Sequence, residues 1–244
     1  MKSNSDKFSP SVSSGNIEKD KMQHKSTSIS TDNEEFDNFN EKLTIPYITS
    51  QKGSKKILKY FDALVINSSQ INLLFSKVID DLEDLVNHKY GNYFTQKLIN
   101  KLSTQQRGKI WGILNKKNIL EYALNEFGNH SIQVLLNLAA QNEQEEDFIM
   151  NLFNPYLSVL AYNKYGIFVI LRIYTLFSNK WIEEIKKFID ENFNSLLFHI
   201  NGVCLIKKYI SYKANISTEE KELFVKMLSK FNYFLLLDKY ALVS

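Results

Sequence analysis

The chain has 244 residues, of which 44% are hydrophobic and 23% are charged, so it can form one folded domain with a sizeable core. Its formal net charge is only +3, which excludes a global basic field as the means of attracting nucleic acid. Any basic surface must therefore be local. Arg107 and Arg172 are the only arginines among the 30 basic residues, and lysine contacts phosphate without arginine's planar fork.

The residue types of metal, disulfide and catalytic sites are sparse. Cys204 is the only cysteine, so the chain can form neither an intramolecular disulfide nor a cysteine-based zinc site. The four histidines show no zinc-binding pattern, and no nucleophile–base set, carboxylate pair or phosphate loop is found. The apolar runs are too short to span a bilayer, and no apolar leader begins the chain. We therefore expect an intracellular protein that is not an enzyme, with no metal, cofactor, small-molecule substrate or membrane partner.

The first segment, residues 1–43, is rich in Ser, Asn, Lys, Asp and Glu. Such a composition buries too little apolar surface to offset the entropy of ordering the chain. The sequence therefore predicts a disordered polar tail over residues 1–43 and a folded domain over residues 44–244. A regulatory or partner-binding role for the tail has no specific motif behind it.

From Leu43 onward, apolar residues recur at intervals of three and four, which is typical of amphipathic helices. One glycine context returns at a period of about 37 residues, and a fixed period of this length indicates a repeat architecture. A sixth copy carries Ala241 in the glycine position and stops at Ser244. We therefore expect about five repeats and a truncated sixth. The repeat glycines are Gly53, Gly91, Gly128, Gly166 and Gly202.

Two further amphipathic stretches separate successive glycine helices. Ser103 and Gln106 form a capping box that opens a helix running to about residue 116, and a short helix follows over 118–126. The same layout recurs over 143–162, where Pro155 suits a first helical turn, and again over 181–199. Three helices in each unit of about 37 residues predict an α-solenoid.

Two repeats carry polar and ring side chains at matching positions after the glycine. Asn lies at position one and Gln at position five, one helical turn apart on the same stripe. A ring side chain at position two lies about 100° round the helix. The amides can meet the edge of an unpaired base while the ring stacks on its face, which is how single-stranded RNA is commonly recognised. The two sets are Asn92, Tyr93 and Gln96, and Asn129, His130 and Gln133.

The motifs GNYxxQ and GNHxxQ, with flanks such as NILEYALNEFGNHSIQVLLN, resemble the base-reading motifs of Pumilio (PUF) repeats. The resemblance covers roughly residue 45 to the end of the chain and implies an all-α, right-handed, armadillo-like solenoid. It also implies that positions one and five together read one base, that Asn with Gln reads uracil, and that the RNA runs antiparallel to the repeats. Asn129 and Gln133 would then read a 5′ uracil and Asn92 and Gln96 the next one, with Tyr93 and His130 stacking.

The other repeats depart from the motif, so the array looks short and eroded beside the eight repeats usual in the family. The first repeat keeps a polar residue, Ser54, at position one, but position two holds Lys55 in place of a ring. The fourth repeat has a ring, Phe168, at position two, while positions one and five are apolar. The fifth repeat has no recognisable base-reading residues. Phe168 is more often groove filler than a stacker in such a setting. Position six is basic in four of five repeats and would suit a phosphate backbone, although exposed positions in a lysine-rich chain are often lysine. The position-six residues are Lys59, Lys97, Val134, Arg172 and Lys208.

Three functions follow from these patterns. The first is a cytoplasmic protein that binds single-stranded, uracil-containing mRNA with weak preference and regulates translation or other post-transcriptional steps. The second is a helical-repeat scaffold that lost RNA reading and binds protein. The third is sequence-independent RNA binding in ribosome biogenesis, with a nucleolar location, as in divergent Pumilio-like proteins. The apolar last unit, Phe231–Val243, is expected to fray, to self-associate or to bind a protein partner.

Overall fold

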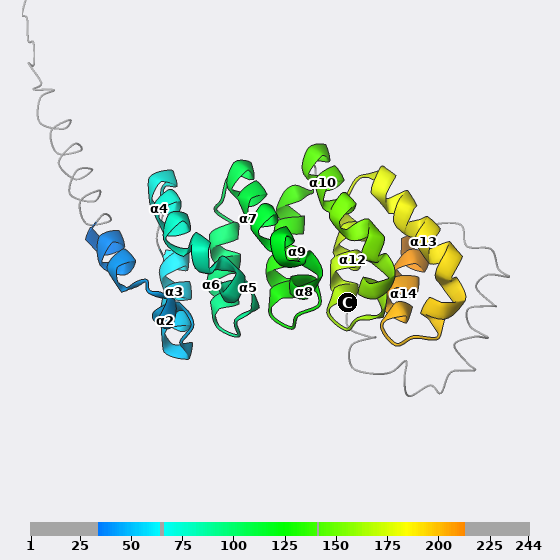
Figure 1. Cartoon of the computed structure of the whole chain (residues 1–244), viewed down its shortest axis with the longest axis horizontal. Coiled ribbons are helices and arrows are strands. Elements are labelled where there is room, and N and C mark those ends of the chain that lie inside the picture. The colour runs from blue at the N-terminus through cyan, green and yellow to red at the C-terminus, as the bar shows by residue number, and fades with distance from the viewer. Residues whose placement is uncertain (1–33, 64–65, 141, 213–244) are drawn as a thin grey trace, which may run out of the picture.

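The computed structural model describes residues 34–63, 66–140 and 142–212, and these residues form helices with no strand (Figure 1). A first helical segment over residues 34–42 precedes the numbered elements. The elements are α2 (Ile45–Ile48), α3 (Gln51–Ala63), α4 (Ser68–Val78), η1 (Ile79–Asp81), α5 (Leu82–Asn87), α6 (Gly91–Ile99), α7 (Thr104–Lys117), α8 (Ile119–Ala123), α9 (Gly128–Ala139), α10 (Glu143–Phe153), η2 (Asn154–Tyr156), α11 (Leu157–Tyr162), α12 (Gly166–Leu176), α13 (Asn179–Leu197) and α14 (Gly202–Tyr212).

The helices repeat in order along the array, and the predicted all-α solenoid is confirmed. The glycine helices α3, α6, α9, α12 and α14 pack against one another in sequence order and form one continuous row. A longer helix and then a short helix precede the glycine of the middle units, as α7 and α8 do before α9. The last described unit differs from the predicted layout, because α13 runs as one helix up to the turn before Gly202. Figure 1 shows successive units following one another from α2 to α14. Residues 213–244, which hold the expected sixth copy and its apolar segment, lie outside the described residues.

The repeat glycines are required where two repeats meet. A Cβ added to Gly128 would lie 2.3 Å from Asn87 Oδ1 and 2.7 Å from the Tyr122 carbonyl oxygen. A Cβ added to Gly166 would lie 2.8 Å from Leu124 Cδ2. In both cases the residue that lies four positions before one repeat's glycine covers the glycine of the next repeat. At these two boundaries the period read from the sequence is therefore also the period of close contacts between repeats.

Residues 34–43 belong to the packed array, although the sequence analysis assigned them to the polar tail. Residues 34–42 are helical, and Phe36, Phe39 and Leu43 are buried. Phe39 stacks on Tyr60 of α3, with ring centroids 3.8 Å apart. Burial, with a smaller contribution from the nearby carboxylates of Glu35 and Asp37, raises the pKa of Tyr60 to about 12. This segment closes the apolar end of the first repeat, so the folded unit begins before residue 44.

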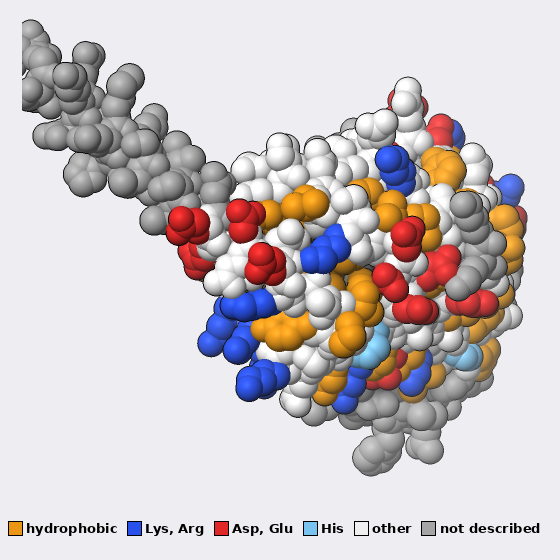
Figure 2. Space-filling model, turned by 60° about the vertical axis from the view of Figure 1, so that its left-hand side comes forward, with side chains coloured by type: hydrophobic (Ala, Val, Ile, Leu, Met, Phe, Trp, Pro, Cys, Tyr) orange, Lys and Arg blue, Asp and Glu red, His pale blue; other side chains and the backbone are white. Residues whose placement is uncertain are grey.

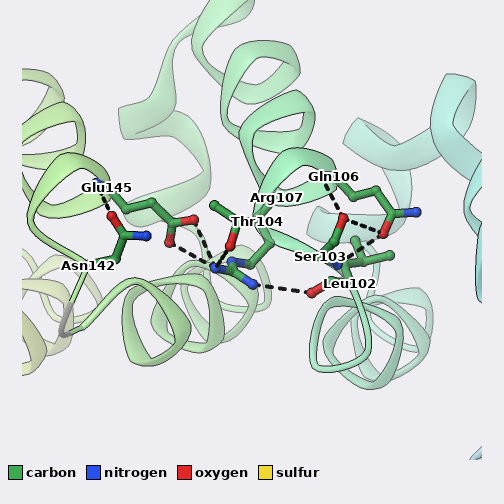
Figure 3. A network of polar contacts seen from close by, with 7 residues as sticks. All are labelled: Leu102, Ser103, Thr104, Gln106, Arg107, Asn142 and Glu145. Carbon is green, nitrogen blue, oxygen red and sulfur yellow. Dashed lines mark hydrogen bonds and ion pairs between the residues drawn. The ribbon is translucent and has the colours of Figure 1, made fainter. Parts of the chain in front are cut away.

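The outer helices α7 and α10 are tied together by a nearly buried ion pair between neighbouring repeats (Figure 3). Arg107 Nη2 donates to Glu145 Oε1 at 2.8 Å, and the side chains of the two residues are only 10% and 12% exposed. Arg107 also donates to the Leu102 carbonyl at 3.2 Å and to the Thr104 hydroxyl at 3.0 Å. The predicted capping box of Ser103 begins α7. A single arginine thus joins the start of one outer helix to the start of the next.

We expect Gly128→Ala to lower the free energy of unfolding by about 1–3 kcal/mol, because the new methyl group must displace backbone at a repeat boundary. Gly112→Ala is the matched control: it lies within α7, where an added Cβ meets nothing within 4 Å. There alanine should raise the stability by about 0.5–1 kcal/mol, the helix-propensity difference. Urea unfolding followed by circular dichroism measures both changes. Equal effects would contradict the assignment of Gly128 to a boundary contact.

We expect Arg107→Ala to lower the free energy of unfolding by about 3 kcal/mol, because it leaves the Glu145 carboxylate nearly buried without its partner. Lys186→Ala is the control, since Lys186 pairs with Glu183 on an exposed helix face. Such exposed pairs contribute below about 1 kcal/mol. Thermal unfolding of the two variants in parallel tests the contrast, and a loss no larger for Arg107 than for Lys186 would refute it.

Candidate nucleic-acid interface

Three ring side chains occupy position two on neighbouring helices of the glycine row. Tyr93 on α6, His130 on α9 and Phe168 on α12 are all exposed, Tyr93 at 49% and Phe168 at 43%. Because α6, α9 and α12 pack in sequence order and the three residues share one register, their rings lie on the same face. In the outermost repeats the same position holds Lys55, which is exposed, and Cys204, which is half-buried. The central three repeats thus offer a row of flat surfaces for bases.

Position one is buried in every described repeat, including the two that carry Asn. Asn92 and Asn129 are each 1% exposed. The Nδ2 group of Asn92 donates to the His88 and Lys89 carbonyls, both at 2.9 Å. Nδ2 of Asn129 makes the equivalent bonds to residues 125 and 126, at 2.8 and 2.9 Å. Both amide donors are thus used within the repeat, and each Asn closes the turn that precedes its helix. The other residues at this position are Ser54, Ile167 and Val203.

The glutamines at position five are half-buried and are held by the asparagines. Gln96 Nε2 donates to Asn92 Oδ1 at 2.8 Å, and Gln133 Nε2 donates to Asn129 Oδ1 at 2.8 Å. The backbone carbonyls around each Asn only accept hydrogen bonds, so its Oδ1 must face the Gln, and the orientation of both amides is fixed. Each Gln therefore presents one remaining N–H donor and its Oε1 acceptor. The structure gives the pair two roles, with Asn orienting the group and Gln presenting it.

The residues at position six do not form a uniform row of free cations. Lys97 pairs with Asp62 of the preceding repeat. Arg172 Nη2 donates to Gln133 Oε1 at 3.4 Å. Lys59 is exposed, while Val134 and Lys208 are half-buried. Two of the four basic side chains therefore contact polar groups of the preceding repeat, in different ways.

The densest basic group lies on α3, beyond the two Asn–Gln repeats. Lys52, Lys55, Lys56 and Lys59 are all exposed on this helix. Figure 2 shows basic side chains gathered at this end of the molecule, next to a group of acidic ones. Lys55 and Lys59 were predicted from the sequence to contact RNA, whereas Lys52 and Lys56 were not. The four lysines within QKGSKKILK were the available signal, and helical periodicity alone does not show that all four are exposed.

The other described repeats have no Asn or Gln side chain at position five. Leu58 and Leu171 occupy position five as half-buried apolar side chains, and Ser54 uses its hydroxyl to donate to the Tyr90 carbonyl at 3.2 Å. Burial raises the pKa of the Cys204 thiol, so the fifth repeat presents a neutral group at position two.

Among the described residues, no group of three or more His, Cys, Asp or Glu side chains could hold a metal ion. None of the helices in that part of the chain is long and apolar enough to cross a membrane.

We expect Asn129→Ala to lower the free energy of unfolding by about 1–2 kcal/mol, because a buried amide with three internal hydrogen bonds is lost. Gln133→Ala should change the stability by no more than about 0.5 kcal/mol, since that side chain is half-buried and bonded at one end. Chemical unfolding of both variants measures the difference. A larger loss for Gln133 than for Asn129 would contradict the roles assigned to the two residues.

Comparison with known proteins identifies the repeats. The profile of the Pumilio-family RNA binding repeat matches residues 83–111 and 118–146, the segments that contain both Asn–Gln pairs. Pumilio homolog 11 of Arabidopsis thaliana is 27% identical over 197 residues, which is 78% of this chain and 34% of that protein. A Pumilio domain-containing protein of Schizosaccharomyces pombe is 25% identical over 154 residues, 63% of this chain and 22% of the relative. The chain thus spans about a third or less of these relatives.

Solved structures give the same fold. The RNA-binding domain of yeast Puf5p bound to MFA2 RNA superposes with a TM-score of 0.58 at 22% identity, covering 81% of this chain and 54% of that one. PUF-8 in complex with PBE-RNA superposes with a TM-score of 0.63 at 17% identity, covering 79% and 53%. The repeat profile, the curated relatives and the shared solenoid agree with one another. The chain carries two repeats that match the Pumilio-family RNA binding repeat, within a helical solenoid similar to that of Pumilio RNA-binding domains.

Proposed function

We propose that the protein binds single-stranded mRNA on the face formed by α6, α9 and α12, prefers adjacent uracils, and acts in post-transcriptional regulation. The observation that carries the proposal is the oriented Asn–Gln pair, present in two adjacent repeats and accompanied in each by an exposed ring. The row of helices can form without the Asn–Gln pair, although each Asn also stabilises its own turn. Ile167 and Leu171 replace both amides in the fourth repeat without interrupting the row.

The chemistry of the Gln amide suits a uracil edge. In a pose where the base stacks beside the ring at position two, uracil N3–H can donate to Gln Oε1. The remaining Nε2–H can donate to a uracil carbonyl oxygen. Asn fixes which end of the Gln amide faces the base, so the amide cannot flip to suit a base whose ring nitrogen is an acceptor, such as adenine N1 or cytosine N3. The fixed amide thus favours uracil over adenine and cytosine, with stacking supplied by Tyr93 or His130.

The magnitudes predict weak sequence-specific binding. Stacking contributes about 1–3 kcal/mol per base, and each hydrogen bond adds about 0.5–1.5 kcal/mol net. Two bases, each with one stack and two bonds, give roughly 4–12 kcal/mol, while association and ordering cost about 4–15 kcal/mol. A measurable affinity therefore depends on the α3 lysines and should fall steeply with salt.

Known complexes support RNA as the ligand. A solved Puf4 RNA-binding domain is bound to a 3′ UTR recognition sequence, and this chain covers 58% of that domain with a TM-score of 0.60. Because the chain spans only part of its relatives, its own RNA, its effect on translation and its protein partners belong to the proposal. A cytoplasmic location is proposed with the function, since mRNA is regulated there and a lone cysteine needs no oxidising compartment.

The test is binding of fluorescent RNA to the purified full chain at low salt. We expect RNA with adjacent uracils to bind more tightly than poly(A). The double variant Gln96→Ala with Gln133→Ala should abolish that preference and keep much of the low-salt binding, because the amides read the base and the lysines hold the backbone.

The matched control is the triple change of Lys55, Lys56 and Lys59 to Ala, which should weaken binding to uracil-containing RNA and poly(A) by the same factor and reduce the salt slope. If the full chain binds no RNA at low salt, the proposal fails and a protein-binding scaffold takes its place. If it binds RNA with no uracil preference, sequence-independent binding takes its place.

A further inference from the structure

The two Asn–Gln repeats differ in what the following repeat places beside the Gln. Arg172, at position six of the fourth repeat, reaches back across the boundary, and its Nη2 lies 3.4 Å from Gln133 Oε1. The residue that occupies the same register after Gln96 is Val134, a half-buried apolar side chain. The Gln of the third repeat therefore has a guanidinium beside it, whereas the equivalent position for the second repeat holds an apolar side chain.

The surroundings of Arg172 leave this guanidinium free to act on a ligand. Arg172 is half-buried, and no carboxylate among the described residues pairs with it. The other arginine, Arg107, is bound at 2.8 Å to Glu145 and to two further oxygens. A contact of 3.4 Å is long for an N–H···O bond and holds the group only loosely. Arg172 is thus placed at the Gln133 amide, and within the described part of the chain most of its five donors are unused.

A guanidinium in this place changes which base edge is accepted. In the uracil pose, Gln Oε1 receives the N3–H of the base. Cytosine carries a lone pair at N3, which would face Oε1 and repel it. Beside Gln133, an N–H of Arg172 can turn from Oε1 to that lone pair, and a second can reach cytosine O2, since a planar fork matches two adjacent acceptors. Beside Gln96, Val134 offers no such donor.

We propose that Arg172 is a specificity-determining residue of the third repeat, where its guanidinium lets the subsite accept cytosine as well as uracil, while the Gln96 subsite accepts uracil alone. This inference rests on the proposed RNA binding and goes beyond it, because it moves Arg172 from the phosphate backbone to a base edge. The two subsites then differ in selectivity although their Asn–Gln pairs have the same geometry.

The experiment measures anisotropy of labelled adenosine-rich RNAs with a central UU, CU or UC, using the full chain at low salt. For the wild type, one of the two cytosine substitutions should leave the affinity nearly unchanged, and the other should weaken it by about three- to ten-fold, the effect of losing one or two hydrogen bonds. Both orders are tested, so the direction of the RNA need not be assumed.

Reciprocal variants at the two equivalent positions supply the control. Arg172→Val should make both substitutions costly, because the third repeat then resembles the second. Val134→Arg should make both tolerated, because the second then resembles the third. Arg172→Lys should keep the affinity for UU and lose the tolerance for cytosine, since a point charge serves a phosphate but cannot fork onto N3 and O2. Circular dichroism melts confirm that each variant is folded.

Two outcomes overturn the inference alone. In one, Arg172→Val weakens UU, CU and UC by the same factor, which assigns Arg172 to the backbone. In the other, the wild type loses the same affinity for CU as for UC, so the subsites are equivalent. Absence of binding by the wild type to all of these RNAs at low salt overturns the proposed function and this inference together.

Discussion

Close contact between repeats at the start of the glycine helices α9 and α12 is the constraint on which the centre of the array depends. Gly128 and Gly166 admit a side chain of the preceding repeat at distances that a methyl group would occupy. This contact sets the separation of α6, α9 and α12, so it also sets the separation of the rings and amides that these helices carry. The exposed rings and Gln amides therefore recur in the same register along the row because successive glycine helices pack directly against one another.

Much of the fold could be predicted from the sequence because its strongest signals are local and periodic. The recurring glycines predicted the solenoid, and Ser103 with Gln106 predicted the start of α7. The N-terminal boundary was placed too late, since Phe36, Phe39 and Leu43 already follow a helical interval of three and four. A few apolar residues in a polar segment are easily discounted when the helix that buries them is not known.

The face that carries the Asn–Gln pairs could be predicted less well, because its geometry comes from contacts that a linear pattern does not contain. Asn92 resembles a solvated surface residue in sequence, yet its amide is buried by bonds to the preceding turn. Arg172 lies 39 residues from Gln133, so local patterns placed it in a basic stripe. The positions of the amides were predictable, whereas their burial, orientation and neighbours required the packed structure.

The contacts across the boundaries also limit how freely the repeats can be exchanged. Asn87 covers Gly128 and Leu124 covers Gly166, while Tyr162 packs against His199 and accepts a hydrogen bond from Asn201 at 3.0 Å. The same position in the repeat therefore carries a different side chain, with a different partner, at each of these boundaries. An engineer who wished to reorder or duplicate repeats to obtain a new RNA specificity would have to cut within a repeat and move each boundary whole. The unit that could be exchanged in this protein is therefore the junction between two repeats. A single repeat, as the sequence shows it, would separate the two sides of each junction.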